Sequence, residues 1–253
     1  MADKFTSNLQ LALNGETPLF GGWITGPTLI GPQEFARAGY DYVGFDAQHG
    51  YLDDVDIAGI LRQIEQVPIG TLVRLPDANP APIGRVLDAG ADAVVIAMIE
   101  SAEQAAAAVA ATRYPPLGIR SFGPLRASLG HDATALEARV SVFAMIETAA
   151  ALSDLEQICG VEGLTGIYVG PADLAISMGF DAVGATRKPE VLDNIVRVHR
   201  AATDAGLVTG IHAGEGKTGC AMGQLGFHMV TLAAEAQALR RGAAEYLREA
   251  KTL

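Results

Sequence analysis

Short apolar runs alternate with longer amphipathic stretches along the whole chain. The runs span four to six residues and favour β-branched side chains, whereas the stretches between them are rich in Ala and place apolar residues at helical spacing. The runs predict eight strands, at Leu19–Ile24, Tyr42–Phe45, Thr71–Leu75, Ala93–Met98, Val142–Ile146, Gly166–Val169, Val208–Ile211 and His228–Leu232. The stretches predict helices at Leu52–Gln66, Ile83–Ala89, Ala102–Arg113, Ala149–Cys159, Pro189–Ala205, Lys217–Gln224 and Glu235–Ala250. Strands that alternate with helices in this way are typical of a parallel α/β fold.

The pattern favours one closed (β/α)₈ TIM barrel that comprises residues 1–253 as a single domain. A barrel of this kind usually has about 250 residues, and no Pro/Gly-rich linker divides the chain. A doubly wound open sheet is the structural alternative. Its site would lie at a topological switch point instead of around a ring of strand ends.

Charge and composition exclude several classes of partner. The formal net charge of −11 and the lack of any basic run disfavour nucleic acid, since phosphate binding depends on clustered Lys and Arg. No apolar run approaches the roughly 18 residues that a membrane span needs. The first residues show no signal-peptide pattern, so a cytoplasmic protein is expected. Cys159 and Cys220 lack metal-ligand spacing and are interpreted as small apolar side chains.

One segment interrupts the alternation. Tyr114–Asp132 is rich in Gly and Pro and lies between the predicted helix Ala102–Arg113 and the fifth strand. Irregular segments of this length are usually functional or disordered. Its arginines, Arg120 and Arg126, make it a candidate for binding a polar substrate group, and a plain surface excursion is the alternative.

Polar residues gather where the predicted strands end. In TIM barrels the active site lies at the carboxyl ends of the strands, so these residues are expected to converge. Each alone has a structural explanation, such as packing or helix capping, but their convergence at one rim favours a functional site. The residues are Trp23, Asp46, His49, Arg74, Glu147, Gly170, Pro171, Ala172, Asp173 and His212.

Glu147 and Asp173 are the candidate ligands of a hard divalent cation. Such ions commonly take one or two protein carboxylates and complete their coordination with water and substrate oxygens. A 2-oxo acid suits the open positions, and the metal would polarise its ketone so that an enolate is stabilised. Arg74 would add charge stabilisation, and His49 is the natural acid/base because imidazole titrates near neutrality. Gly170 and Ala172 are candidate backbone N–H donors; Pro171, which has no N–H, is not.

A Schiff-base mechanism is disfavoured by the lysines. The chain has only Lys4, Lys188, Lys217 and Lys251, and none of them ends a predicted strand. An imine-forming aldolase needs a desolvated lysine directed into its site. Lys217 follows the seventh strand, but its Gly-rich and polar neighbours indicate exposure.

Six segments together resemble the HpcH/HpaI aldolases, metal-dependent class II pyruvate aldolases that act on 4-hydroxy-2-oxo acids. The segments are FDAQHG, VRLP, VLDAGADAVVIAMIE, ATRYPPLGIRS, MIET and VGPADL. Each is weak alone, but their order and spacing form a strong signal. The likeness extends from about Trp23 to the last predicted helix.

The resemblance implies reversible aldol cleavage to pyruvate or hydroxypyruvate plus an aldehyde. It implies Mg²⁺, Mn²⁺ or Co²⁺ held by Glu147 and Asp173, Arg74 as the cation that stabilises the enolate, and no organic cofactor. It also implies that Asp88 pairs with the acid/base His49. A homohexamer is implied as well, in which the C-terminal helix packs against a neighbouring subunit.

Three residues depart from the family pattern. Gln48 stands where members often have Glu, Met145 replaces a glutamine that contacts substrate in some members, and His212 occupies a position that is apolar in some. Met145 and His212 are therefore expected to line a changed donor pocket, which could favour hydroxypyruvate. Two alternatives remain: a citramalyl- or malyl-thioester lyase of the same superfamily, and a non-catalytic barrel that binds 2-oxo acids.

Overall fold

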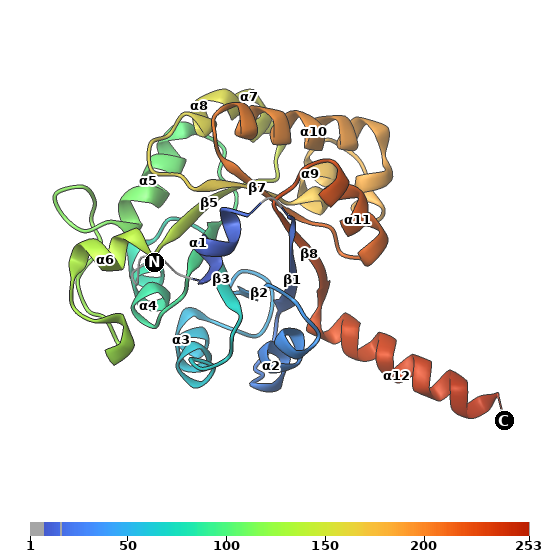
Figure 1. The fold of residues 1–253 in the computed structure, drawn as a ribbon. Coiled ribbons are helices and arrows are strands. Elements are labelled where there is room, and N and C mark those ends of the chain that lie inside the picture. Colours follow the sequence, from blue (N-terminus) through green and yellow to red (C-terminus); the bar gives the residue numbers. More distant parts are fainter. Residues whose placement is uncertain (1–7, 16, 253) are drawn as a thin grey trace.

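The chain folds into a closed barrel of eight parallel strands (Figure 1). This is a computed structural model, and it describes residues 8–15 and 17–252. The strands are β1 (Leu19–Ile24), β2 (Tyr42–Asp46), β3 (Gly70–Leu75), β4 (Ala93–Ile96), β5 (Ser141–Ile146), β6 (Gly166–Val169), β7 (Val208–His212) and β8 (Met229–Ala234). They pair in sequence order, and β8 pairs with β1. The predicted TIM barrel is confirmed, and the doubly wound alternative is wrong. Lys4 and the first seven residues of the stretch without a signal-peptide pattern lie outside the described part.

Helices surround the barrel, and several of them were not predicted. The long ones are α3 (Asp54–Gln63), α4 (Pro80–Asp88), α5 (Ala102–Thr112), α10 (Pro189–Asp204), α11 (Gly216–Gln224) and α12 (Glu235–Lys251). The unpredicted ones are α1 (Asn8–Leu13), α2 (Ile30–Arg37), α6 (Ala133–Ala138) and α9 (Pro171–Ser177). The predicted helix Ala149–Cys159 is interrupted at Asp154 and forms α7 (Ala149–Ser153) and α8 (Leu155–Cys159). The predicted strand Ala93–Met98 was too long, because β4 ends at Ile96.

Local capping explains where several helices begin. Asp53 accepts hydrogen bonds from the backbone N–H groups of Val55 and Asp56, which forms a capping box at the start of α3. The Asn79 side chain caps α4, and Pro80 follows at the first helical position, where its missing N–H costs nothing. Ser101 caps α5 in the same way.

The barrel interior is filled by large side chains placed opposite glycines. A Cβ at Gly44 would lie 2.2 Å from the Trp23 ring, and a Cβ at Gly210 would lie 2.5 Å from the Tyr168 ring. Glycine is therefore required at both positions, because only it lets the neighbouring aromatic ring fill the barrel. The hydroxyl of Tyr168 shares a hydrogen bond with Thr231 Oγ1, at 2.5 Å. These layers form a packed floor beneath the carboxyl ends of the strands.

The arginine-bearing segment 114–132 lies at the amino end of the barrel. Arg120 is 2% exposed and donates to Asp88 Oδ1 at 2.7 Å, and Arg126 pairs with Glu65 at 3.3 Å. Asp88 is the last residue of α4, four positions before Asp92, whose carboxylate accepts from the Thr71 N–H where β3 begins. Within one chain Arg120 and Arg126 therefore lie away from the carboxyl ends of the strands, and their binding of a substrate group stays a prediction that would need a second copy of the chain.

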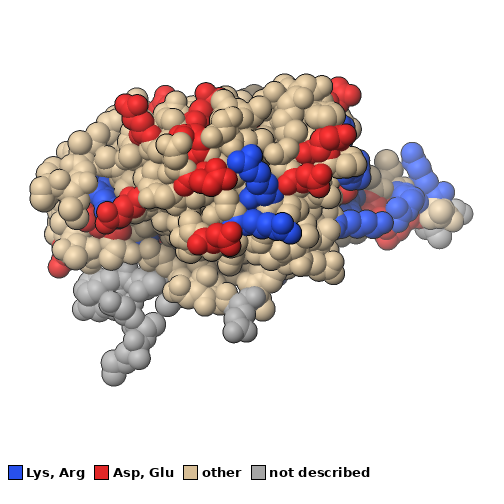
Figure 2. Space-filling model, turned by 90° about the horizontal axis from the view of Figure 1, so that it is seen from above, with Lys and Arg blue, Asp and Glu red and all other residues tan. Residues whose placement is uncertain are grey.

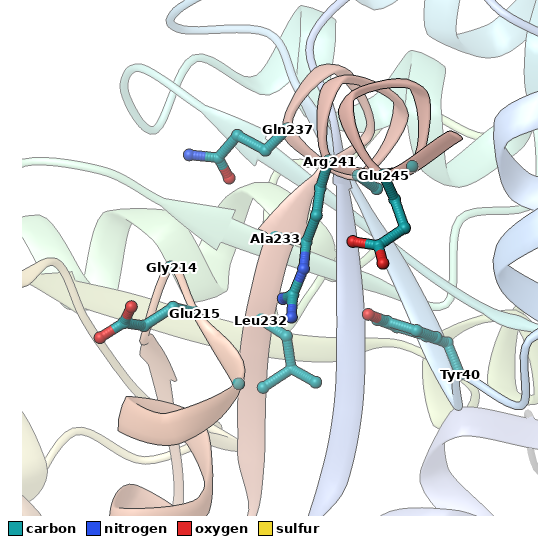
Figure 3. A pocket seen from close by; sticks show the side chains of 11 residues that line it. Tyr40, Gly214, Glu215, Leu232, Ala233, Gln237, Arg241 and Glu245 are labelled. Atoms are coloured by element: carbon teal, nitrogen blue, oxygen red, sulfur yellow. The ribbon is translucent and has the colours of Figure 1, made fainter. Parts of the chain in front are cut away.

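The last helix, α12, projects away from the barrel (Figure 1). No residue of α12 is buried, and Leu239, Tyr246 and Leu247 are exposed apolar side chains on it. A cavity of 680 Å³ lies where α12 leaves the barrel, and its lining includes Arg241 and Glu245, which extend from the helix beside Leu232 (Figure 3).

Charged side chains of both signs are distributed over the surface. Acidic groups are scattered across the face shown in Figure 2, and basic groups gather near its middle and along the projecting α12. None of the helices in the described part of the chain is long and apolar enough to cross a membrane.

Candidate active site

A cavity of 330 Å³ opens at the carboxyl ends of the strands. It brings together all of the predicted strand-end residues except Glu147, and its lining does not include Asp88, Arg120 or Arg126. Its lining consists of Trp23, Thr25, Asp46, His49, Arg74, Met145, Tyr168, Gly170, Pro171, Ala172, Asp173, His212, Ala234 and Gln237. These residues come from strands that are distant in sequence, as expected for a site built on the rim of a barrel.

Arg74 is held in place by two hydrogen bonds to one buried carboxylate. At the end of β3, its Nε and Nη2 donate to the two oxygens of Asp46, at 3.0 and 2.5 Å. Burial would raise the pKa of Asp46, but the hydrogen bonds and the charge of Arg74 outweigh burial and hold that pKa below its usual value. Among the described residues, no hydrogen bond engages Nη1 of Arg74. The guanidinium is therefore fixed in orientation while one of its nitrogens remains available to a ligand.

Trp23 completes this charged pair. Its Nε1 donates to Asp46 Oδ2 at 3.1 Å, and the Arg74 guanidinium carbon lies 5.5 Å from the centre of its ring. The only polar atom of the indole is thus engaged by the protein. Trp23 forms an apolar wall of the cavity and donates no hydrogen bond to a substrate.

His49 lies at the rim of the cavity. Asp46 Oδ1 accepts hydrogen bonds from the backbone N–H groups of Gln48 and His49, each at 3.0 Å, and these fix the turn that follows β2. The residue is exposed and lines the cavity, so its imidazole is accessible to both solvent and a bound ligand.

Glu147 carries the most unusual polar atom of the site. The carboxyl is buried just past β5, and its Oε1 accepts from the backbone N–H of Met98 at 2.8 Å. Its Oε2 is buried without a hydrogen-bond partner. Burial raises the pKa of Glu147 and the neighbouring Asp173 raises it further, whereas the hydrogen bond from the Met98 N–H and the charge of Arg74 oppose this rise. A buried oxygen without a partner is costly unless a proton or a cation satisfies it.

The short helix α9 supplies Asp173 and the predicted backbone donor Ala172, and Gly170 precedes it as the N-cap residue. Asp173 lies in its first turn, and the Ala172 N–H is among those that have no acceptor within the helix. The expectation that Gly170 donates to substrate is wrong, because its N–H donates to Ile146 O at 3.2 Å. Glycine serves another purpose here: a Cβ at position 170 would lie 2.6 Å from Glu147 Oε2.

Met145 and His212 both line the cavity, as predicted. Met145 is buried in the barrel interior. The His212 ring meets Trp23 edge-on, with the ring centroids 5.3 Å apart. Burial and the charge of Arg74 lower the pKa of His212 to about 4, so its imidazole is neutral at pH 7. A neutral imidazole offers the cavity both a hydrogen-bond donor and an acceptor.

Asp88 is not brought to His49 within one chain. His49 follows the carboxyl end of β2, whereas Asp88 ends α4 at the opposite side of the barrel and pairs there with Arg120. A pairing between Asp88 and His49 requires a second copy of the chain.

Some cavity residues were not predicted. Tyr168 could have been found, since alternate residues of β6 face the barrel interior and a large polar ring at such a position reaches the site. Thr25 and Gln237 carried no signal that separates them from loop residues. Met98, which contacts Glu147 through its backbone N–H without lining the cavity, carried none either.

A closed barrel with two carboxylates, an arginine and a histidine at the carboxyl ends of its strands has the architecture of a TIM-barrel enzyme. The sequence profile of the HpcH/HpaI aldolase/citrate lyase family matches residues 20–241. A hydroxypyruvate/pyruvate aldolase of Rhizorhabdus wittichii is 34% identical over 98% of this chain and 100% of its own length. A 4-hydroxy-2-oxovalerate aldolase of Rhodococcus jostii is 34% identical over 83% of each chain.

Solved structures agree with these sequence matches. A crystal structure of an HpcH/HpaI aldolase/citrate lyase family protein from Burkholderia cenocepacia has a TM-score of 0.88 and 31% identity, covering 97% of this chain and 100% of that one. The chain therefore belongs to the HpcH/HpaI aldolase/citrate lyase family. The predicted family and its lyase class are confirmed.

Proposed function

We propose that the protein catalyses the reversible aldol cleavage of a 4-hydroxy-2-oxo acid with a divalent cation held by Glu147 and Asp173. The observation that carries this proposal is the buried Oε2 of Glu147, which has no protein partner and lies close enough to Asp173 for that carboxylate to raise its pKa. Family membership supplies the reaction class.

The residues present fit a hard cation such as Mg²⁺ or Mn²⁺. In residues 8–15 and 17–252, no group of three or more His, Cys, Asp and Glu side chains is arranged to hold a metal. Two carboxylates with open positions for water and substrate are the arrangement that Mg²⁺ commonly adopts. A bound cation would act as a Lewis acid that polarises the 2-oxo group.

The cleavage step can be assigned to residues around the cavity. His49 accepts the proton of the C4 hydroxyl, the C3–C4 bond breaks, and the aldehyde leaves. The electron pair moves toward C3 and the C2 oxygen, where Arg74 stabilises the developing negative charge. The N–H of Ala172, which has no acceptor within α9, would donate to the substrate carboxylate. His49 then returns the hydroxyl proton to C3, which yields the 2-oxo acid and restores the neutral imidazole.

The donor pocket favours a small and polar 2-oxo acid. A volume of 330 Å³ is at the lower end for ligand sites. Met145 contributes no hydrogen bond, whereas the neutral His212 can bind the additional hydroxyl of hydroxypyruvate. The relative from Rhizorhabdus wittichii is named for hydroxypyruvate as well as pyruvate, which supports the same donors here.

The cavity gives little support to a thioester lyase. A nucleotide-bearing thioester needs a long groove with several cations for its phosphates, whereas the described lining of this cavity contains one Arg and no Lys. A cytoplasmic location remains a prediction.

We infer in addition that the chain forms a homohexamer in which α12 packs on a second copy. The exposed Leu239, Tyr246 and Leu247 and the cavity beside Arg241 support this, because an isolated helix without buried residues is marginal in water. Pairing of His49 with Asp88 across copies would follow from such an assembly. Light scattering is expected to give six times the chain mass, and a monomer would contradict the inference.

The activity is tested with protein that has been stripped by a chelator. We expect no turnover until Mg²⁺, Mn²⁺ or Co²⁺ is restored, and then aldol formation from an aldehyde with pyruvate or hydroxypyruvate. Donor preference is measured with both acids, and equal rates would remove His212 as a selectivity residue. Turnover that survives thorough chelation would refute the metal mechanism. Activity with acyl thioesters alone would support the alternative lyase.

A further inference from the structure

Met98 has a backbone conformation that its residue type disfavours. Its φ is 55°, and among the described residues it is the only non-glycine with a positive φ. The left-handed region crowds the Cβ of an L-residue, so such conformations persist only where the surroundings enforce them, often at functional sites. Its neighbours Ala97 and Ile99 are buried, whereas the Met98 side chain is 44% exposed. The conformation is therefore held by the flanking chain and is not explained by packing of the side chain.

This conformation turns one backbone N–H away from the sheet. The backbone hydrogen bonds between β3 and β4 continue as far as Ala97, whose N–H donates to Leu75 O at 2.9 Å. The next N–H, that of Met98, donates instead to Glu147 Oε1 at 2.8 Å, although the two residues are 49 positions apart. The change of direction at Met98 thus connects the end of β4 to the carboxyl that follows β5.

The hydrogen bond divides the two oxygens of the Glu147 carboxyl between two tasks. Oε1 is engaged by the protein, while Oε2 is buried without a partner. On its far side Oε2 lies against position 170, where even a Cβ would come within 2.6 Å. The carboxyl is fixed from both directions, and a single oxygen remains to bind a cation.

We propose that Met98 is a positioning residue whose left-handed backbone holds Glu147 so that Oε2 alone ligates the metal. This inference rests on the proposed metal-dependent function. It assigns the contribution of Met98 to the direction of its N–H, with no requirement for the thioether. Tolerance of the left-handed conformation, instead of size or polarity, should therefore decide which residues can replace it.

Four substitutions separate these properties. Glycine and asparagine, in Met98→Gly and Met98→Asn, tolerate a positive φ best. Met98→Leu keeps an apolar side chain that is unbranched at Cβ, as in methionine. Met98→Val introduces a β-branched side chain, which disfavours a positive φ most. The dissociation constant for Mn²⁺ is measured by electron paramagnetic resonance of the free ion, and thermal unfolding of the metal-free variants reports their folding. We expect the Gly, Asn and Leu variants to bind Mn²⁺ within about threefold of the wild type, and Met98→Val to bind about tenfold more weakly, the effect of losing one hydrogen bond to a charged group.

Two results would overturn the proposal. The first is a folded Met98→Val variant that binds Mn²⁺ with wild-type affinity. The second is weaker Mn²⁺ binding by Met98→Asn and Met98→Gly but unchanged binding by Met98→Val, which would indicate that the methionine side chain itself has the role. If Met98→Val does not fold, hydrogen exchange of the Met98 amide in ¹⁵N-methionine-labelled, metal-free protein tests the proposal instead. The amide should be protected in the wild type and exchange faster in Glu147→Ala; an unprotected amide in the wild type rejects the proposal.

Asp173→Ala is the reference for the metal site. Mn²⁺ binding that is unchanged by this substitution would refute the proposed function itself.

Discussion

Replacing Arg74 by lysine is expected to lower kcat for aldol cleavage by about a hundredfold to a thousandfold, the usual effect of losing one preorganised donor to a developing oxyanion. Arg74 binds both oxygens of Asp46 through Nε and Nη2, which leaves Nη1 for the ligand. A lysine ammonium keeps the charge but cannot hold Asp46 at two points and present a third donor in a fixed direction. The measurement is steady-state kinetics with saturating Mn²⁺.

Lysine is a sharper test than alanine because Asp46 is 1% exposed. An alanine at position 74 would leave that carboxylate buried without its cation, and removing one partner of a buried pair commonly costs about 3–5 kcal/mol. Lost activity could then reflect unfolding. Arg197→Lys is the matched control, since Arg197 pairs with Glu156 on the exposed outer surface at 3.2 Å and should tolerate lysine. Near-normal turnover by Arg74→Lys would remove Arg74 from the mechanism.

The arrangement of the barrel could be predicted because each strand and most helices carry a local signal. Buried strands appear as short apolar runs, and helices appear as apolar residues at helical spacing, so the order of elements follows from neighbouring residues alone. Residues that end strands converge by the geometry of the barrel, which is why Arg74, Asp173 and His212 could be assigned to one cavity without any knowledge of their distances.

Interactions between distant segments could not be predicted in this way. No local pattern shows that Asp46 binds Arg74, or that Met98 donates to Glu147, since these contacts depend on the register between strands and on one unusual backbone angle. The direction of a long loop is equally hidden. Arg120 looked like a substrate-binding residue, but its segment folds to the amino end of the barrel, where it pairs with Asp88.

Replacing Glu147 by glutamine is expected to have opposite effects on metal binding and on stability. An amide can still accept the Met98 N–H through its oxygen, but it then directs an NH₂ group, which cannot ligate a cation, to the place of Oε2. We expect the dissociation constant for Mn²⁺ to rise at least about a hundredfold, since loss of groups that only orient metal ligands already costs 10–100-fold. Turnover should fall correspondingly.

The metal-free Glu147→Gln variant should nevertheless be at least as stable as the wild type. The raised pKa of Glu147 means that its charged form is disfavoured in the folded protein, first by burial and then by Asp173. A group with a raised folded pKa contributes its full stability below its unfolded pKa and loses it as the pH rises through the folded pKa. The stability difference in favour of glutamine should therefore grow as the pH increases from about 4.5, the ordinary value for glutamate. Thermal unfolding of the wild type and of Glu147→Gln across this pH range measures the stability difference. Saturating Mn²⁺ should reverse the order of the two stabilities, because only the wild type is stabilised by binding the ion. A glutamine variant that is less stable than the wild type without metal at neutral pH would show that the buried carboxylate contributes to the fold and is not held there for a cation.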